Sequence, residues 1–210
     1  AIANTGLGGM IVNSTLHGRK MTEEEQAVLA KHHKEHFPDV KIVTKRPAGF
    51  NGPGYAPELK TIYSPTSAHP AILAHEMGHA TGTGRHLSHY GGPMQRLYVS
   101  GPATATLAAA ALGGQRWAMK GKTEKERDER LKKLQIASAA GGAAALPLLA
   151  EEARASMHAV NLGRKAGKGG EYARHLLPAF GTYAALPVGL TAGTMYGLHK
   201  MREANRKKRG

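Results

Sequence analysis

The pattern of apolar and polar positions predicts a helix near the start of the chain. Residues 21–37 carry a sparse apolar face, made of Val28, Leu29 and Phe37. Thr22 and Glu25 have the spacing of a capping box, in which each side chain accepts from the other residue's backbone amide. Pro38 ends the helix, because proline has no amide hydrogen for a further turn.

Two short segments after this helix show the alternation of strands. Residues 40–45 (VKIVTK) and 58–64 (ELKTIYS) are rich in β-branched and aromatic side chains. The stretch between them, RPAGFNGPGYAP, is dominated by glycine and proline and is expected to be a loop.

A second helix is expected in PTSAHPAILAHEMGHATGTG. Pro70 suits the first helical turn, and Gly82 with Gly84 suits its end. Ile72, Leu73 and Met77 form the side expected to face a core. Helix, strand, strand and helix make a small α+β unit, which we expect over residues 1–93.

The rest of the chain, 94–210, is expected to be helical and membrane-embedded. Three apolar blocks, Leu97 to Gly114, Leu134 to Ala150 and Leu176 to Leu198, each approach the ~20 residues that span a bilayer. They are rich in Ala, Gly and Thr, which allow close helix packing in lipid. A soluble Ala-rich bundle remains the alternative. Basic segments separate the blocks and follow the last one: an expected loop from Gln115 to Lys133, the stretch 163–174, and a basic tail at 200–210.

Charge and cysteine content narrow the choice of partners. The net charge is +14 with a pI near 10.1, so phosphate groups of lipid or nucleic acid are expected to attract the chain. Lipid headgroups are favoured, because no nucleic-acid-reading motif is present. There is no cysteine, so a zinc site would need His, Asp or Glu ligands.

The stretch AHEMGHA contains the spacing His-Glu-x-x-His. His75 and His79 are four residues apart, so both imidazoles project from one helix face and can each bind Zn²⁺. Glu76 lies beside them, where its carboxylate can act as the general base of a zinc peptidase. A pair of surface histidines on an amphipathic helix is the plain alternative.

A third metal ligand can be sought close to this motif. The stretch resembles that of the metzincins, whose third histidine would fall at position 85, but Arg85 stands there and His86 comes one residue late. His86 or His89 is one option. Absence of a third ligand, leaving a relic or a weak metal site, is another.

A downstream glutamate is the favoured third ligand. AHEMGHA together with EEARAS, at 151–156, resembles the gluzincin pattern Glu-x-x-Ala-Ser of membrane zinc peptidases related to the CAAX prenyl proteases and heat-shock membrane peptidases, and of bacterial neutral zinc metallopeptidases. The resemblance implies a zincin-like fold, Glu152 as ligand and Ser156 as the residue orienting a ligand histidine. Glu151 is the alternative ligand.

These features predict a membrane-associated zinc endopeptidase that cuts a peptide or protein substrate. The substrate would add as a strand near Thr61 to Ser64, and His158, Tyr172 or His175 would stabilise the oxyanion. The positive-inside rule places the loop 115–133 and the basic tail 200–210 in the cytoplasm and the zinc site on the other side of the membrane, although residues 163–174 are basic as well. The alternative is a phage virion structural or ejection protein with a retained zincin fold.

Overall fold

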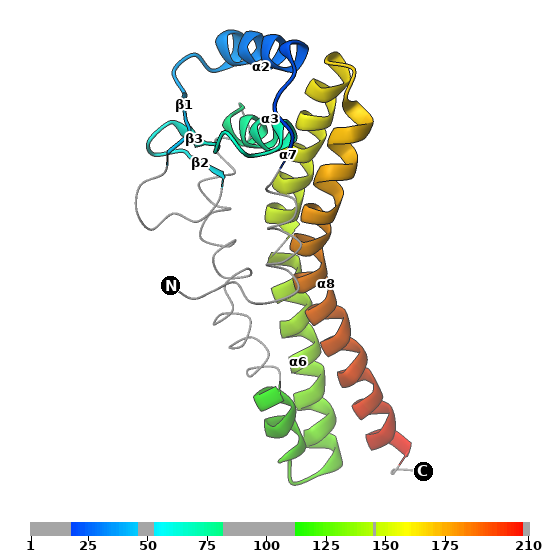
Figure 1. Ribbon diagram of the computed structural model, residues 1–210. Helices are drawn as coiled ribbons and strands as arrows, with labels where there is room; N and C mark the ends of the chain where they lie inside the picture. The colour runs from blue at the N-terminus through cyan, green and yellow to red at the C-terminus, as the bar shows by residue number, and fades with distance from the viewer. Residues whose placement is uncertain (1–17, 46–52, 82–111, 145, 208–210) are drawn as a thin grey trace. The chain divides into compact units, whose positions relative to one another are not determined.

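The computed structural model describes residues 18–45, 53–81, 112–144 and 146–207, whose helices and strands are labelled in Figure 1. The chain divides into two compact units, each with its own core. The first comprises Ala1–Gly92 with Leu148–Thr182, and the second comprises Pro93–Pro147 with Tyr183–Gly210. Helices dominate, and a three-stranded sheet lies in the first unit, so the fold is α+β as the sequence predicts.

Helix α2, Glu23–His36, begins with the expected capping box. The Thr22 amide donates to Glu25 Oε2 at 2.8 Å, and the Glu25 amide donates to Thr22 Oγ1 at 3.3 Å. Leu29 and Phe37 are buried in the core of the first unit, so the sparse apolar face faces inward as predicted. Pro38 follows directly after the cap residue Phe37.

The sheet contains β1 (Lys41–Val43), β2 (Gly54–Ala56) and β3 (Thr61–Tyr63) in the order β1-β3-β2. The prediction of a loop across 46–57 is wrong for β2. Its three residues pair antiparallel with β3, with Tyr55 opposite Ile62. The Gly- and Pro-rich sequence around β2 does not predict a strand. The strand forms because β3 offers hydrogen-bonding partners for its backbone.

Strand β3 is the central strand, which overturns one prediction about substrate binding. It pairs with β1 in parallel and with β2 antiparallel, and all three of its residues are buried. A peptide adds to a sheet only at an unpaired edge. The segment Thr61–Ser64 therefore cannot accept a substrate strand, and an added strand would have to use β1 or β2.

Helix α3, Pro70–Ala80, carries the His-Glu-x-x-His stretch through the core of the first unit. Pro70 occupies the first turn as expected, and the His69 ring caps the helix by accepting from the Ala71 amide at 3.1 Å through Nδ1. Met77 is almost fully buried and Ile72 nearly so, in agreement with the predicted core side.

A network of charged groups holds the N-terminal end of α3. Because Nδ1 of His69 is an acceptor, its Nε2 donates, and Glu171 of α8 accepts at 2.9 Å. Arg19 bridges Glu171 and Glu25, with contacts of 2.8 Å and 2.6 Å. Residues far apart in the sequence thus fix the start of α2, α3 and α8 relative to one another.

Helix α7 (Leu146–Lys165) and the first part of α8 (Gly169–Lys207) complete the first unit. The sequence-based boundary assigned all of 94–210 to a second region, whereas the structure groups Leu148–Thr182 with residues 1–92. A Cβ atom on Gly78 would lie 2.7 Å from Cα of Ala155, so α3 and α7 approach closely there. Side chains from α7 and α8, namely Ala159, Leu162, Tyr172 and Leu176, pack with those of α2, β3 and α3 in one core.

The second unit is helical. Residues 112–119 and α6 (Glu124–Ala144) are helical, so the prediction of a loop at 115–133 is wrong for most of that segment. Thr123 caps α6 by accepting from the Glu126 amide, and Glu126 pairs with Arg130 one turn later. Such local pairs stabilise a highly charged helix that apolar periodicity alone does not reveal.

Within the described residues, one helical stretch, Glu124–Lys165, is long and apolar enough to cross a membrane by length and composition. It comprises α6 and α7 and contains the predicted block Leu134–Ala150. In the described part of the chain no second helix meets that criterion, and the block 176–198 lies inside α8. Most of the block 97–114 lies outside the described residues.

Candidate metal centre

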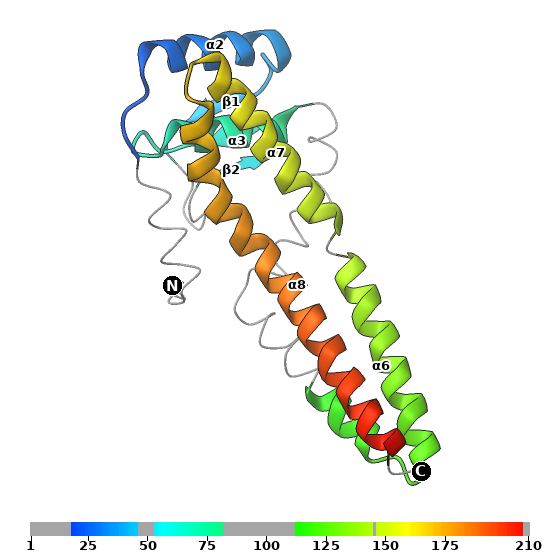
Figure 2. The ribbon, with the colours of Figure 1, turned by 90° about the vertical axis from the view of Figure 1, so that its right-hand side faces the viewer.

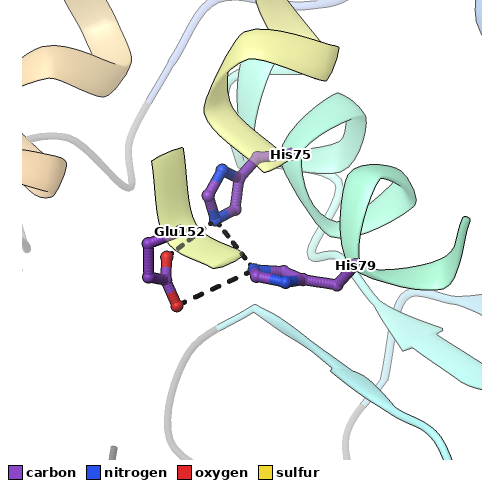
Figure 3. Close-up of side chains that lie close together, drawn as sticks. All are labelled: His75, His79 and Glu152. Carbon is purple, nitrogen blue, oxygen red and sulfur yellow. Dashed lines mark hydrogen bonds and ion pairs between the residues drawn. The ribbon is translucent and has the colours of Figure 1, made fainter. Parts of the chain in front are cut away.

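Three side chains from two helices of the first unit converge on one point (Figure 3). His75 and His79 project from the same side of α3 because they are separated by one helical turn. Their Nε2 atoms lie 3.1 Å apart. Glu152 of α7 approaches both, with one oxygen 3.2 Å from His75 Nε2 and the other 3.8 Å from His79 Nε2. The ligand atoms of all three residues lie within 4.8 Å of one another.

This group is largely shielded from water. The side chains of His75 and His79 are 14% and 12% exposed, and that of Glu152 is 6% exposed. Two imidazole nitrogens and one carboxylate are donors that suit a transition metal ion such as zinc. The residues present therefore fit a metal ion, and the two histidines keep a small exposed fraction.

Each histidine is held from behind by a polar side chain of α7. Ser156 Oγ lies 3.3 Å from Nδ1 of His75, as the sequence pattern anticipates for this position. Glu151 Oε1 lies 2.8 Å from Nδ1 of His79. A carboxylate that accepts from Nδ1 leaves Nε2 as the free donor to a metal and fixes the orientation of the ring.

Glu151 thus takes a different position from Glu152. The sequence left these two adjacent acids as alternative ligands. In the structure Glu151 lies behind His79, while Glu152 faces both Nε2 atoms. Glu151 is nearly inaccessible, with a side chain only 3% exposed. The structure therefore favours Glu152 over Glu151 as the third member of the group.

Arg154 is a member of the site that sequence reasoning missed. Its guanidinium donates to both oxygens of Glu151 at 2.8 and 3.0 Å. It also donates to the Gly78 carbonyl at 2.7 Å and to Thr81 Oγ1 at 2.9 Å, at the end of α3. Arg154 therefore neutralises the buried Glu151 and ties α7 to the C-terminal end of α3. The i,i+3 spacing from Glu151 was the available local signal.

The pKa values in this buried group are set by charges that lie close together: the imidazole of His79 and the carboxylates of Glu76, Glu151 and Glu152. Burial on its own lowers the pKa of His79, but the hydrogen bond to Glu151 and the charges of Glu152, Glu76 and Glu151 raise it to about 9. Burial would raise the pKa of the Glu152 carboxyl, yet the hydrogen bond to His75 and the charge of His79 hold it below its usual value. The pocket thus favours a positive charge, which a metal ion also supplies.

Glu76 lies on α3 next to the two histidines. Its side chain belongs to a buried residue, and its negative charge contributes to the raised pKa of His79. The charge of Glu76 therefore reaches the His79 imidazole electrostatically. This position is compatible with the general-base role that the sequence pattern suggests.

The residues considered as oxyanion stabilisers lie elsewhere in the first unit. His158 contacts His32 of α2, with ring centroids 4.8 Å apart. Tyr172 and His175 contact His69, the cap of α3, which precedes His75 and His79 by more than one turn. His86 and His89 lie outside the described residues.

A groove of about 400 Å³ lies between α7 and α8 of the first unit. Its lining is mostly apolar, from Met157, Val160, Leu176, Leu177 and Phe180, with Asn161 and Arg164 adding polar groups. Ser156 belongs both to this lining and to the contact with His75. The groove therefore adjoins the back of the His75 ring and does not contain Glu152.

No family model matches the chain, and neither a curated protein nor a solved structure matches it.

Proposed function

We propose that the protein is a membrane-associated zinc endopeptidase. The observation that carries the proposal is the convergence of His75 Nε2, His79 Nε2 and the Glu152 carboxylate beside Glu76. Two histidines and a glutamate from separate helices, with a further carboxylate in the next position of the motif, are the groups that hydrolytic zinc sites use.

The residues would divide the chemistry among them. A zinc ion held by His75, His79 and Glu152 would acidify a water molecule and polarise the scissile carbonyl. Glu76 would accept the proton from the attacking water and pass it to the nitrogen of the leaving amine as the carbon–nitrogen bond breaks. Glu151 and Ser156 keep the imidazoles oriented through Nδ1.

A peptide substrate could bind to the sheet of the first unit at either of its outer strands. Since β3 is paired on both sides, an extended substrate would add to β1 or β2. Main-chain hydrogen bonds made there would be independent of the substrate's sequence. Side-chain selection would then come from groups around the entry to the metal group.

The membrane part of the proposal rests on the second unit. Seven large apolar side chains of this unit are exposed. The stretch Glu124–Lys165, which runs from α6 of this unit into α7 of the first unit, has an apolar window that is only 12% buried. A bilayer is the surrounding that stabilises such a surface. The exposed side chains are Leu112, Trp117, Met119, Ile136, Leu146, Val188 and Tyr196.

The two basic segments of the second unit lie together. Arg202, in the basic tail at 200–210, contacts Asp128 of the segment 115–133 at 3.0 Å and Gln135 at 2.6 Å, both in α6. A shared position supports the idea that both segments face the same side of a membrane. By the positive-inside rule that side is the cytoplasm, with the metal group on the other side.

The test is zinc content and peptide cleavage by the purified full chain. Wild-type protein should bind about one zinc at this group and cleave a mixture of unstructured peptides. Glu76→Gln should keep the zinc and lose about 10²–10⁴-fold in kcat, while His75→Gln should lose both. Glu35→Gln, an exposed acid of α2, is the matched control and should behave as wild type.

The proposal fails if cleavage by Glu76→Gln equals that of wild type. It also fails if His75→Gln leaves zinc content unchanged, because the histidine would then not hold the ion.

A further inference from the structure

A second group of histidines lies on another side of the first unit. His32 and His36 are one turn apart on α2, and His158 comes from α7, which runs near α2 in Figure 2. The ring centroids of His32 and His36 are 4.3 Å apart, and those of His32 and His158 are 4.8 Å apart. For comparison, the rings of His75 and His79 at the first group are 4.7 Å apart. The centroid distances between these rings are therefore similar to the distance between the His75 and His79 rings.

Two nitrogens of this histidine group lack partners. Within the described part of the chain, His32 Nε2 and His158 Nε2 are buried from water and form no hydrogen bond. A buried polar atom without a partner is destabilising, and an ion or water that occupies the site is a common explanation. His33, the neighbour of His32, differs because its Nε2 lies 2.6 Å from the Val40 carbonyl.

Burial also lowers the pKa of His32 and His158, which keeps their imidazoles neutral so that a metal cation can bind their lone pairs. Burial and, to a smaller extent, the neighbouring positive groups lower the pKa of His32 to about 4. Burial and the Arg154 charge do the same for His158, whose pKa is also about 4. Both imidazoles are therefore neutral at pH 7, and a metal ion does not have to displace a proton from them.

We propose that His32, His36 and His158 form a second binding site for a divalent transition metal ion such as Zn²⁺. His32 and His158 offer their unpartnered Nε2 atoms. His36 is exposed, so its ring can change rotamer toward the buried pair at little cost. Imidazole is the ligand that zinc, copper and nickel share, while the exposed side leaves room for water as a further ligand.

An ion at this site would join α2 to α7. Helix α7 carries Glu151, Glu152 and Ser156, which form one side of the first metal group. The second ion would therefore restrict movement of α7 without touching the first group. The second site does not depend on the peptidase proposal, because none of its ligands is His75, His79 or Glu152.

The test is the zinc stoichiometry of the full chain, measured by elemental analysis and calorimetric titration after chelation and refilling. His36→Gln should reduce the zinc content by about one equivalent relative to wild type, because it removes one ligand of the site. The side chain is exposed, so this change should not disturb the fold. His158→Gln should have the same effect on the zinc content. His199→Gln removes an exposed histidine from the second unit and should leave the content unchanged.

The two metal groups can be told apart by their variants. Loss of one equivalent in His36→Gln and of another in His75→Gln supports both sites. Loss only in His36→Gln supports the second site and contradicts the peptidase proposal. A zinc content that neither His36→Gln nor His158→Gln changes overturns the second site, whatever His75→Gln does.

Discussion

Glu151 Oε1 lies 2.8 Å from Nδ1 of His79, on the side of the imidazole that faces away from Glu152. The two consecutive acids of α7 therefore approach the same histidine from opposite ring nitrogens. This relationship assigns them different expected roles, since one accepts from the ring and the other is left to bind a metal.

Replacement of the two acids should separate these roles. Glu152→Gln should abolish zinc binding at the first group, because it removes a charged ligand. Glu151→Gln should keep the ion but weaken its affinity about 10–100-fold, because an amide orients the ring less strongly. Competition titration with a chromophoric chelator measures both. His86→Ala serves as control and should retain wild-type affinity; the reverse order of effects would make Glu151 the ligand.

A side chain on Gly78 should disturb the approach of α3 and α7. The added Cβ of Gly78→Ala would meet the Ala155 backbone at 2.7 to 2.9 Å, and backbone cannot give way as a flexible side chain can. We expect a loss of about 1–3 kcal/mol in unfolding free energy and weaker zinc binding, as α7 and Glu152 shift away. Chemical denaturation followed by circular dichroism provides the measurement.

The matched control is another helical glycine of the same unit. Gly181 of α8 has no atom within 4 Å of the added Cβ position, so Gly181→Ala should stabilise the protein by about 0.5–1 kcal/mol. Equal effects of both substitutions would show that helix propensity, not the close approach, governs Gly78.

The ion pair of Arg19 with Glu25 should make stability fall in acid. Burial would raise the pKa of Glu25, but hydrogen bonds from Arg19 and the Thr22 amide lower it to about 2, from 4.5. Between these values the unfolded chain binds the proton that the folded chain does not, so stability falls as pH decreases. The contribution is complete above about pH 4.5 and is lost as the pH approaches 2.

Glu25→Gln should therefore cost about 1.5–3 kcal/mol at pH 7, because it removes the charge that Arg19 binds while the amide oxygen can still accept from the Thr22 amide. The difference from wild type should shrink between pH 4.5 and 2 in urea titrations. Glu23→Gln, an exposed acid in the same turn, should change stability by less than about 0.5 kcal/mol. A pH-independent difference would show that the Glu25 charge contributes nothing.

Membrane association can be tested on the second unit. Ile136 of α6 is 62% exposed, and a lysine there would oppose contact with hydrocarbon. Ile136→Lys should weaken partitioning into anionic phospholipid vesicles on the order of tenfold or more in a flotation assay. Leu59→Lys changes a side chain of similar exposure, 58%, in the first unit and should have little effect. Equal partitioning of Ile136→Lys and wild type would contradict a bilayer contact at this helix.

Local features of the fold were predictable from the sequence. The Thr22–Glu25 capping box, the strands around Ile42 and Ile62, and the helix that begins at Pro70 all depend on residues within a few positions of one another. For the same reason the sequence determined that His75 and His79 share one helix face. Strand β2 was not predictable, because it exists only through its pairing with β3.

The partner of those histidines was decided by tertiary structure. Adjacent residues on a helix project about 100° apart, so the rotation of α7 determines whether Glu151 or Glu152 faces α3. That rotation is set by the close approach at Gly78 and by contacts such as Arg154 with the Gly78 carbonyl, 76 positions apart in the chain. The sequence supplied the chemically suitable residues. Packing between distant helices determined which of them meet, because no local interaction fixes how one helix is turned toward another.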